Sequence, residues 1–321
     1  MDPKTKAVII LCFGDIMFGA LSIFTRHFGD MGFSSFTITF IRTGVSALIL
    51  FIVLLMFKRD CLRVDRKGLL LFLSFTVFKI ATDVTFFFAL NNSNIALSTM
   101  LQMTFPYYVL ILSFLIFKES ITPTKIAAML LAFVGCVLLT GGVITEGNAF
   151  SEGIIAAIVS GLCLAVYIMG GSVSYKKGYD PSSYILYSSL FSTAILIPFT
   201  DLSAVGSAIL DINEIPYILG LGVLVSLVPT FMDAWSAKYL LPTTISVIGM
   251  LELVSAAVIG VLVFDEILEL KDVFGMILVM ASILLINIGI FLKFKKYIKL
   301  HPDLLEKLKA ERERVESLHK R

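Results

Sequence analysis

Long apolar runs, separated by short polar segments, fill the chain from its start to residue 293. A helix that crosses a bilayer needs about 20 mainly apolar residues. The strands of a membrane barrel are shorter and alternate in polarity, which these runs do not. The pattern therefore predicts ten membrane-spanning helices, over Ala7–His27, Phe33–Phe57, Gly68–Leu90, Ile95–Phe117, Thr122–Ile144, Gly153–Ser174, Ser182–Thr200, Pro216–Tyr239, Thr243–Phe264 and Val273–Lys293.

Composition supports this interpretation. Of the 321 residues, 58% are hydrophobic and 16% are charged, and the mean hydropathy is +0.94. A soluble protein is about 45–50% apolar and about 25% charged. These values predict an all-α integral membrane protein whose surroundings are the lipid bilayer. No basic patch interleaved with aromatic residues suggests a nucleic-acid partner.

Lysine and arginine are unevenly distributed among the polar segments. They gather before the first span, in residues 58–67, after the fourth and sixth spans, and at Lys238. The alternate segments are neutral or acidic, apart from Arg26 and Lys271. Because positively charged segments stay in the cytoplasm, the distribution predicts a multi-pass protein of the cell (plasma) membrane with both termini cytoplasmic.

Two spans of equal length end alike. Ala96–Glu119 closes with phenylalanine, a charged residue and glutamate, and so does the stretch that ends at Phe264-Asp265-Glu266. When Glu119 is aligned with Glu266, the first five spans align with the second five. Because five is odd, the second copy must enter the membrane from the opposite side, which is an inverted repeat. The predicted units are residues 1–147 and 148–293, followed by a charged cytoplasmic tail helix, 294–321.

Six ionisable residues lie inside the predicted spans. A charge at bilayer depth costs about 2.5–3.5 kcal/mol or more, so each needs a partner, water or a proton. The six are Asp15, Arg42, Lys79, Asp83, Asp233 and Glu252. Four acids against two bases leave two carboxylates without a basic partner. A structural alternative is static pairing, such as Lys79 with Asp83 one turn along the same helix.

The excess of acids suggests a proton-linked mechanism. A carboxylate in a low-dielectric environment without a cation tends to take up a proton. We therefore hypothesise that Glu252 or Asp15 binds and releases a proton during transport. Arg42 offers a rigid fork for a carboxylate or phosphate of a substrate. The alternative, which we favour, is that Arg42 neutralises Asp15.

Uncharged polar and aromatic side chains at similar depth complete the candidate cavity. Pro106 is expected to kink the fourth span, which the membrane tolerates only beside protein or a cavity. The further candidates for the cavity lining are Gln102, Tyr108, Tyr167 and Trp235. For tyrosine and tryptophan, the alternative is a position in the interfacial belt. Glu119 and Glu266, just beyond their spans, are expected to cap the next helix.

Other chemistries lack the residues they need. The four cysteines lie far apart, and His27, His301 and His319 lie at a span end or in the tail, so we expect no disulfide, metal site or cofactor. No histidine stands at bilayer depth for a serine protease, and no Gly-x-Gly-Asp for an aspartyl protease. A phosphate-binding loop is also missing. We therefore expect no enzyme activity.

The joint pattern resembles the EamA-type transporters of the drug/metabolite transporter superfamily. It is carried by ten spans, the inverted duplication, Arg42 within Phe-Ile-Arg-Thr-Gly-Val, and a glutamate closing the fourth and ninth spans. Leu251–Val254 is similar to the family's Glu-Pro-Val, with Leu253 in place of proline. The resemblance, over about residues 5–295, implies a central cavity lined by the first, third, fourth, sixth, eighth and ninth spans.

The resemblance also implies export of small metabolites, often amino acids, or of drugs. The expected function is a secondary transporter of a small polar metabolite that works by alternating access. A multidrug exporter of lipophilic cations is the alternative within the family. A receptor or scaffold that transports nothing is the alternative outside it. Substrate, coupling ion and oligomeric state, including a homodimer, stay open.

Overall fold

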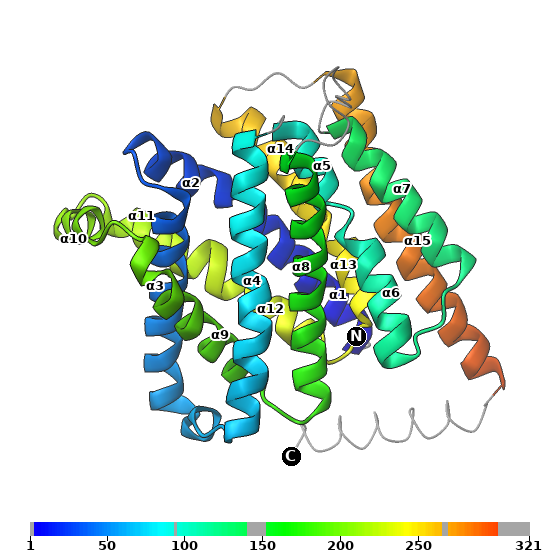
Figure 1. Cartoon of the computed structure of the whole chain (residues 1–321). Helices are drawn as coiled ribbons and strands as arrows, with labels where there is room; N and C mark the ends of the chain where they lie inside the picture. The colour runs from blue at the N-terminus through cyan, green and yellow to red at the C-terminus, as the bar shows by residue number, and fades with distance from the viewer. Residues whose placement is uncertain (1–2, 93–94, 140–151, 265–268, 301–321) are drawn as a thin grey trace, which may run out of the picture.

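The computed structural model describes residues 3–92, 95–139, 152–264 and 269–300, and in these ranges the regular structure is helical (Figure 1). Eight helical runs are long and apolar enough to cross a membrane, and two shorter apolar helices, Phe105–Phe117 and Pro123–Leu139, accompany them. The all-α membrane class is therefore confirmed. The count of ten spans stays a prediction.

The first half of the chain begins and ends its helices at recognisable signals. Ser34 accepts a hydrogen bond from the Thr37 amide at 3.2 Å and so starts the third helix. The elements are α1 (Pro3–Gly19), α2 (Leu21–Asp30), α3 (Ser35–Phe57), η1 (Arg59–Leu62), α4 (Arg66–Asn92), α5 (Ile95–Gln102), α6 (Phe105–Phe117) and α7 (Pro123–Leu139). The first predicted span is thus two helices that meet at Ala20.

The second half contains one helix that the hydrophobic pattern missed. Residues 201–214 were predicted as a loop, yet Asp201 caps a short helix there by accepting from the Ser203 and Ala204 amides, each at 3.0 Å. The elements are α8 (Glu152–Lys176), α9 (Pro181–Leu196), η2 (Ile197–Phe199), α10 (Leu202–Leu210), α11 (Ile215–Leu219), η3 (Gly220–Leu227), α12 (Val228–Ser236), α13 (Pro242–Gly249), α14 (Leu251–Phe264) and α15 (Leu270–Leu300).

The fourth and ninth spans break at corresponding places. The offset that sets Glu119 against Glu266 also sets the end of α5, Gln102, against the end of α13, Gly249. The fourth span resumes one residue before Pro106, as expected of a proline. The ninth span also breaks, although Leu253 stands where the family has proline. The break therefore does not require a proline. Paired breaks in two halves are typical of transporters that bind substrate midway through the membrane.

A third irregularity lies in the eighth span. Its segment η3 is π-helical, and the carbonyl of Gly222 within it accepts a hydrogen bond from Ser46 Oγ of α3 at 2.6 Å. A side chain at Gly222 would collide with α3, because a Cβ there would lie 2.4 Å from Val45 Cβ. Such π-helical turns are frequent near functional sites.

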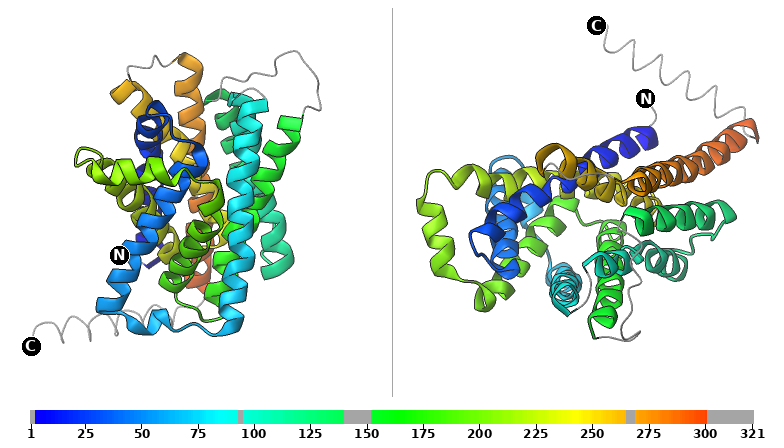
Figure 2. Two further views of the ribbon diagram at one scale, coloured as in Figure 1. Left: turned by 60° about the vertical axis from the view of Figure 1, so that its left-hand side comes forward. Right: turned by 90° about the horizontal axis from the view of Figure 1, so that it is seen from above.

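Helices of the two halves pack directly on one another. The main pairs are α4 with α8, α7 with α15, α3 with α9, and α1 with both α12 and α14 (Figures 1 and 2). At the crossing of α7 and α15, a Cβ on Gly135 would lie 2.7 Å from the Gly275 carbonyl oxygen. The two halves are therefore in direct contact along several helix pairs.

The positively charged segments lie together at one end of the bundle. We call this the basic end; it carries η1, the α8–α9 turn and the α12–α13 turn, and lies at the bottom of Figure 1. At the other end of the first span, His27 on α2 binds Glu214, just before α11, with 2.7 Å between Nε2 and Oε2. The His27 ring also stacks on Tyr217, with 3.7 Å between centroids.

Three predicted features fall on parts of the chain outside the described residues. They are the boundary between the two repeats near residues 145–151, the capping glutamate Glu266, and the charged tail beyond residue 300. The last apolar span was predicted to end at Lys293, and α15 continues to Leu300.

Candidate functional site

A loose ion pair lies near the middle of the bundle. Arg42 on α3 places Nη2 3.9 Å from Oδ2 of Asp83 on α4. Their side chains are 19% and 24% exposed, so a water-sized probe reaches both. One turn before Asp83, the Lys79 ammonium lies 5.7 Å from the ring centroid of Tyr167 on α8, a cation–π distance. Helices α3, α4 and α8 thus converge on one polar group of side chains.

Three carboxyl groups form a second group, the acidic trio: Asp15 on α1, Asp233 on α12 and Glu252 in the first turn of α14. They interact electrostatically with one another. Asp15 is only 4% exposed. Its Oδ2, and Oδ1 of Asp233, are buried without a hydrogen-bond partner in the described part of the chain. A buried polar group without a hydrogen-bond partner costs free energy of folding.

Small residues on α1 bring the acidic trio together. A Cβ on Gly14 would lie 3.2 Å from Met232 Cβ and 3.5 Å from an Asp233 oxygen. A Cβ on Gly19 would lie 1.7 Å from Ser255 Oγ, so α14 could not cross α1 there with a larger residue. The close approach on both sides of Asp15 explains why its carboxyl group is sealed from solvent.

The ion pair and the acidic trio belong to one site. Arg42 acts electrostatically on Glu252, and Asp233 acts on Tyr167. The site therefore collects side chains from α1, α3 and α4 in the first half and from α8, α12 and α14 in the second. An interior reached from both halves is the arrangement that alternating access uses.

The pairing expected for Arg42 was wrong. The structure places its guanidinium beside Asp83, whereas the buried Asp15 oxygen has no hydrogen-bond partner among the described residues. The reason is packing: α1 is held between α12 and α14, on which the other two acids lie. Lys79 and Asp83 interact electrostatically but form no ion pair of 4.0 Å or less within the described ranges, and the Lys79 ammonium lies over the Tyr167 ring.

The remaining candidates divide between the site and its surroundings. Gln102 Nε2 donates to Ser160 Oγ at 2.8 Å, and Ser160 Oγ donates to the Thr82 carbonyl at 3.0 Å, which joins α5, α8 and α4. Tyr108 packs in an apolar cluster with Val109. Gln102 therefore supports the helices of the site, and Tyr108 takes part in ordinary apolar packing.

Trp235 lies away from the acidic trio. Its ring lies 4.9 Å from that of Tyr239, and Lys6 Nζ lies 5.7 Å from its centroid. It packs against a buried cluster that includes Ala7 and Leu251. Two residues along α12 from Asp233, it points to a different side of the helix.

The capping role expected for Glu119 was also wrong in detail. Its carboxylate binds side chains rather than helix amides: Ser113 Oγ donates to one oxygen, and Lys125 Nζ lies 2.6 Å from the other. Glu119 and Lys125 are 5% and 8% exposed. The buried ion pair fixes the α6–α7 turn, a structural role.

A chain of aromatic rings, missed from the sequence, runs from the site to the basic end. Tyr167 stacks on Tyr184 with 5.9 Å between centroids, Tyr184 meets Tyr175 at 6.0 Å and Phe72 at 5.4 Å, and Phe72 meets Tyr179 at 5.2 Å. The Tyr184 hydroxyl donates to the Tyr167 carbonyl at 3.2 Å. The signal in the sequence was the set of tyrosines from Tyr167 to Tyr184, around the turn between the sixth and seventh spans, which a search for charges passes over.

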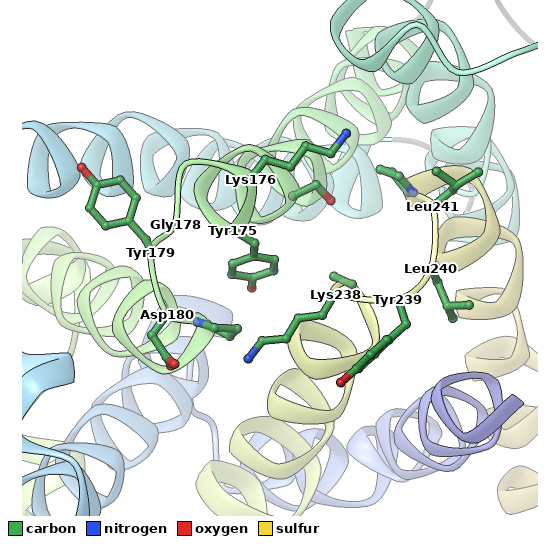
Figure 3. A pocket seen from close by; sticks show the side chains of 13 residues that line it. Tyr175, Lys176, Gly178, Tyr179, Asp180, Lys238, Tyr239, Leu240 and Leu241 are labelled. Carbon is green, nitrogen blue, oxygen red and sulfur yellow. The ribbon is translucent and has the colours of Figure 1, made fainter. Parts of the chain in front are cut away.

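At the basic end this aromatic chain reaches a pocket of about 500 Å³. We call it the basic-end pocket. It lies between the α8–α9 turn and the α12–α13 turn, and its polar and aromatic lining includes Tyr175, Lys176, Tyr179, Asp180, Lys238 and Tyr239 (Figure 3).

No group of three histidine, cysteine, aspartate or glutamate side chains is placed to hold a metal ion within the described ranges. The four cysteines are free thiols.

Comparison with known proteins decides the family. The model of the EamA-like transporter family matches the chain twice, over residues 5–141 and 151–288. The chain belongs to the EamA-like transporter family. It is a multi-pass membrane transporter of the drug/metabolite transporter type, built from two EamA repeats.

Two individual proteins resemble this EamA-like chain. An uncharacterized transporter from Archaeoglobus fulgidus is 27% identical over 283 residues, which cover 87% of this chain and 95% of the relative. A solved structure described as "Crystal structure of protein" superposes with a TM-score of 0.71 at 16% identity. The match covers 88% of this chain and 97% of that one. The second likeness shows the fold alone.

For an EamA-like transporter, the charges between the halves have a direct meaning. A transporter must offer its substrate polar partners in an environment where water does not compete strongly. Arg42, Asp83 and Glu252 are partly exposed charged side chains of both signs in this region. Asp15, by contrast, is buried.

Proposed function

We propose that this protein is a secondary transporter that exports a small polar metabolite by alternating access, with proton exchange at the acidic trio. The observation that carries the proposal is the pair of unpartnered, buried carboxyl oxygens on Asp15 and Asp233 beside the accessible Arg42–Asp83 pair. Unpaired charge at this depth is expensive in a protein whose only task is to stay folded.

The proposed architecture is ten spans in two inverted five-helix repeats, in the cell membrane, with the basic end and both termini cytoplasmic. The two family matches of similar length support a duplication. The corresponding breaks of the fourth and ninth spans support the inverted arrangement. The lysines at the basic end support the orientation.

Arg42 is proposed to bind the anionic group of the solute. At 3.9 Å its bond to Asp83 is longer than a good charge-assisted hydrogen bond, about 2.7–2.9 Å, so a ligand can compete for it. The guanidinium presents two parallel donors that match a carboxylate or phosphate. Lys79, held only over the Tyr167 ring, is a second cation within the same group.

The acidic trio is proposed to exchange protons. Three carboxyl groups that feel one another's charge cannot all be ionised in a poorly hydrated space without a high cost. Arg42 is the cation that acts on Glu252, and Tyr167 is the aromatic hydroxyl that Asp233 acts on. A solute that binds Arg42 therefore changes the charge around Glu252, and with it the affinity of Glu252 for a proton. This links solute binding to proton binding.

The test begins with substrate discovery. A deletion strain and an overexpressing strain are compared for metabolites inside and outside the cell, and the solutes that change in opposite directions are assayed in proteoliposomes. We expect Arg42→Gln to abolish counterflow of the anionic or zwitterionic solute, while Arg26→Gln, near the end of the first span, leaves it unchanged. Full counterflow by the Arg42 variant contradicts the assigned role.

The alternative within the family is export of lipophilic cations. The acidic trio and the tyrosines beside it favour this second candidate. The two candidates separate in one assay, because Arg42→Ala stops transport of anionic or zwitterionic solutes in the first and leaves transport of cations intact in the second. A scaffold that transports nothing is disfavoured by the exposed fractions of Arg42 and Asp83, which a sealed interior does not have.

A further inference from the structure

The basic-end pocket contains two charges that the proposed central site does not use. Of its two lysines, Lys176 places Nζ 3.3 Å from the centroid of the Phe117 ring, so its charge is engaged. The Tyr179 hydroxyl is also engaged, because it donates to Asp65 Oδ1 at 2.7 Å. The other charged side chains of the pocket are Lys238 and Asp180, and Tyr175, Tyr239 and Ser172 add hydroxyl groups (Figure 3).

Lys238 and Asp180 carry opposite charges and come from two different turns that line the pocket (Figure 3). Lys238 follows α12, and Asp180 is the N-cap of α9, where its Oδ1 accepts from the Ser182 amide at 2.8 Å. They feel each other's charge, yet neither belongs to an ion pair of 4.0 Å or less within the described ranges. The cap holds the carboxylate in place, and the lysine stem reaches across from the other turn.

The aspartate stays ionised. Partial burial works to raise the pKa of Asp180, but the hydrogen bonds from Ser182 and the charges of Lys238 and Lys58 outweigh it and hold that pKa below its usual value. A cap-held anion and a cation that line one hollow offer a ligand two opposite charges.

We propose that the basic-end pocket is a vestibular binding site for a small dipolar solute, whose anionic group binds Lys238 and whose ammonium group binds Asp180. A volume of about 500 Å³ is that of a small-molecule site. The proposal rests on the proposed transport function and deepens it by adding an access site. Tyr175 in the pocket contacts Tyr184, which contacts Tyr167, and the Tyr167 ring lies beside Lys79. These aromatic rings therefore connect the pocket to the central charges.

The chain carries its own probe for this pocket. Trp235 is its one tryptophan, and its ring lies 4.9 Å from Tyr239, which lines the pocket. Tryptophan fluorescence of the purified full-length protein is titrated with ω-amino carboxylates of increasing chain length. Their N-acetyl derivatives, which lack the cation, and their amides, which lack the anion, are the matched controls. Calorimetric titration of the same compounds gives a second measurement that does not depend on the tryptophan.

We expect saturable binding with an optimum chain length, set by the spacing of the two charges. The N-acetyl and amide derivatives should bind about fivefold more weakly, the effect of one partly exposed ion pair. Lys238→Gln and Asp180→Asn should each weaken binding of the dipolar compound by about the same fivefold factor. Asparagine is as good an N-cap as aspartate, so α9 is kept. Lys177→Gln, on the same turn but outside the pocket lining, should change nothing.

Three results overturn the proposal. One is the absence of both fluorescence and heat changes with every compound. Another is equal binding of the N-acetyl derivatives with no effect of Asp180→Asn, which identifies a site for anions such as lipid phosphate. The third is an unchanged half-saturation concentration for transport in the Lys238 and Asp180 variants, together with loss of transport in Arg42→Gln. That result supports the proposed transport function and rejects the binding site in the basic-end pocket. Conversely, the protein could bind the dipolar compounds, lose that binding in the Lys238 and Asp180 variants, and yet transport no solute. That result refutes the proposed transport function and supports the binding site.

Discussion

Arg42 and Asp83 face each other across the polar interior, with Nη2 of one 3.9 Å from Oδ2 of the other. The pair joins α3 to α4, two consecutive spans of the first repeat, and neither residue's counterpart in the second repeat is charged: Ser189 and Thr230 stand at the positions given by the offset between Glu119 and Glu266. The two EamA repeats therefore contribute differently to the site. The first brings both cations, and the second brings two of the three acids of the trio.

The Arg42–Asp83 pair predicts non-additive effects on stability. Arg42→Gln leaves the Asp83 carboxylate without its cation, and Asp83→Asn leaves the guanidinium without its anion, so each single change should lower the melting temperature in detergent. The double variant should lose less than the sum, with a coupling of about 0.5–3 kcal/mol. Thermal melts of the four proteins measure this. Additive losses would show that the two side chains act independently.

Proton exchange at the acidic trio predicts a changed pH profile in Glu252→Gln. The substitution keeps the shape of the side chain but removes its capacity to bind and release a proton. We expect the rate of proton-driven transport in proteoliposomes to fall and to depend less on pH, while counterflow without a pH gradient is less affected. Glu269→Gln, whose carboxylate pairs with Lys271 at 2.7 Å on the surface, is the matched control. An unchanged pH profile removes Glu252 from the proton pathway.

The close crossing of α7 and α15 predicts a strong effect of a single methyl group. In Gly135→Ala the added Cβ would lie 2.7 Å from the Gly275 carbonyl oxygen, which belongs to the backbone and cannot move aside easily. We expect destabilisation of about 1–3 kcal/mol. Gly206→Ala in α10 is the control, because a Cβ there meets nothing within 4 Å. In that exposed helix the change should stabilise by about 0.5–1 kcal/mol. Equal melting temperatures of the two variants contradict the expectation.

The link between η1 and the α8–α9 turn predicts a pH-dependent contribution to stability. The hydrogen bond from Tyr179 holds the pKa of Asp65 below its ordinary value. A lowered pKa in the folded protein contributes stability that is present above the ordinary value, about 3.9, and disappears as the pH falls through the lower, folded one.

Tyr179→Phe removes this bond. We therefore expect its melting temperature to lie below that of the unchanged protein at pH 5–8, by an amount that shrinks as the pH is lowered past about 4. Tyr239→Phe is the control, because Tyr239 lines the basic-end pocket and the hydroxyl that binds Asp65 is that of Tyr179; it should show no such trend. A difference for Tyr179→Phe that stays constant down to pH 3 is evidence that the lost contribution is packing rather than the bond to Asp65.

Local rules were enough for the membrane class and for the candidate residues. The bilayer demands about 20 apolar residues in succession, a requirement that each segment meets or fails by itself. Isolated charges within such segments can likewise be identified from the sequence alone. This is why the apolar spans, the duplication and the six ionisable residues could be predicted before any contact was known, and why the transporter family could be named from them.

Contacts between distant segments decided the rest. Arg42 meets Asp83 rather than Asp15 because helix rotation and packing, not distance along the chain, select the partner. The break of the ninth span at Met250, without a proline, and the π-helical η3 against Ser46 likewise depend on neighbouring helices. The sequence by itself determined which residues enter the membrane; only the tertiary structure decided which of them meet, because side-chain pairing is set by the packing of helices that lie far apart in the chain.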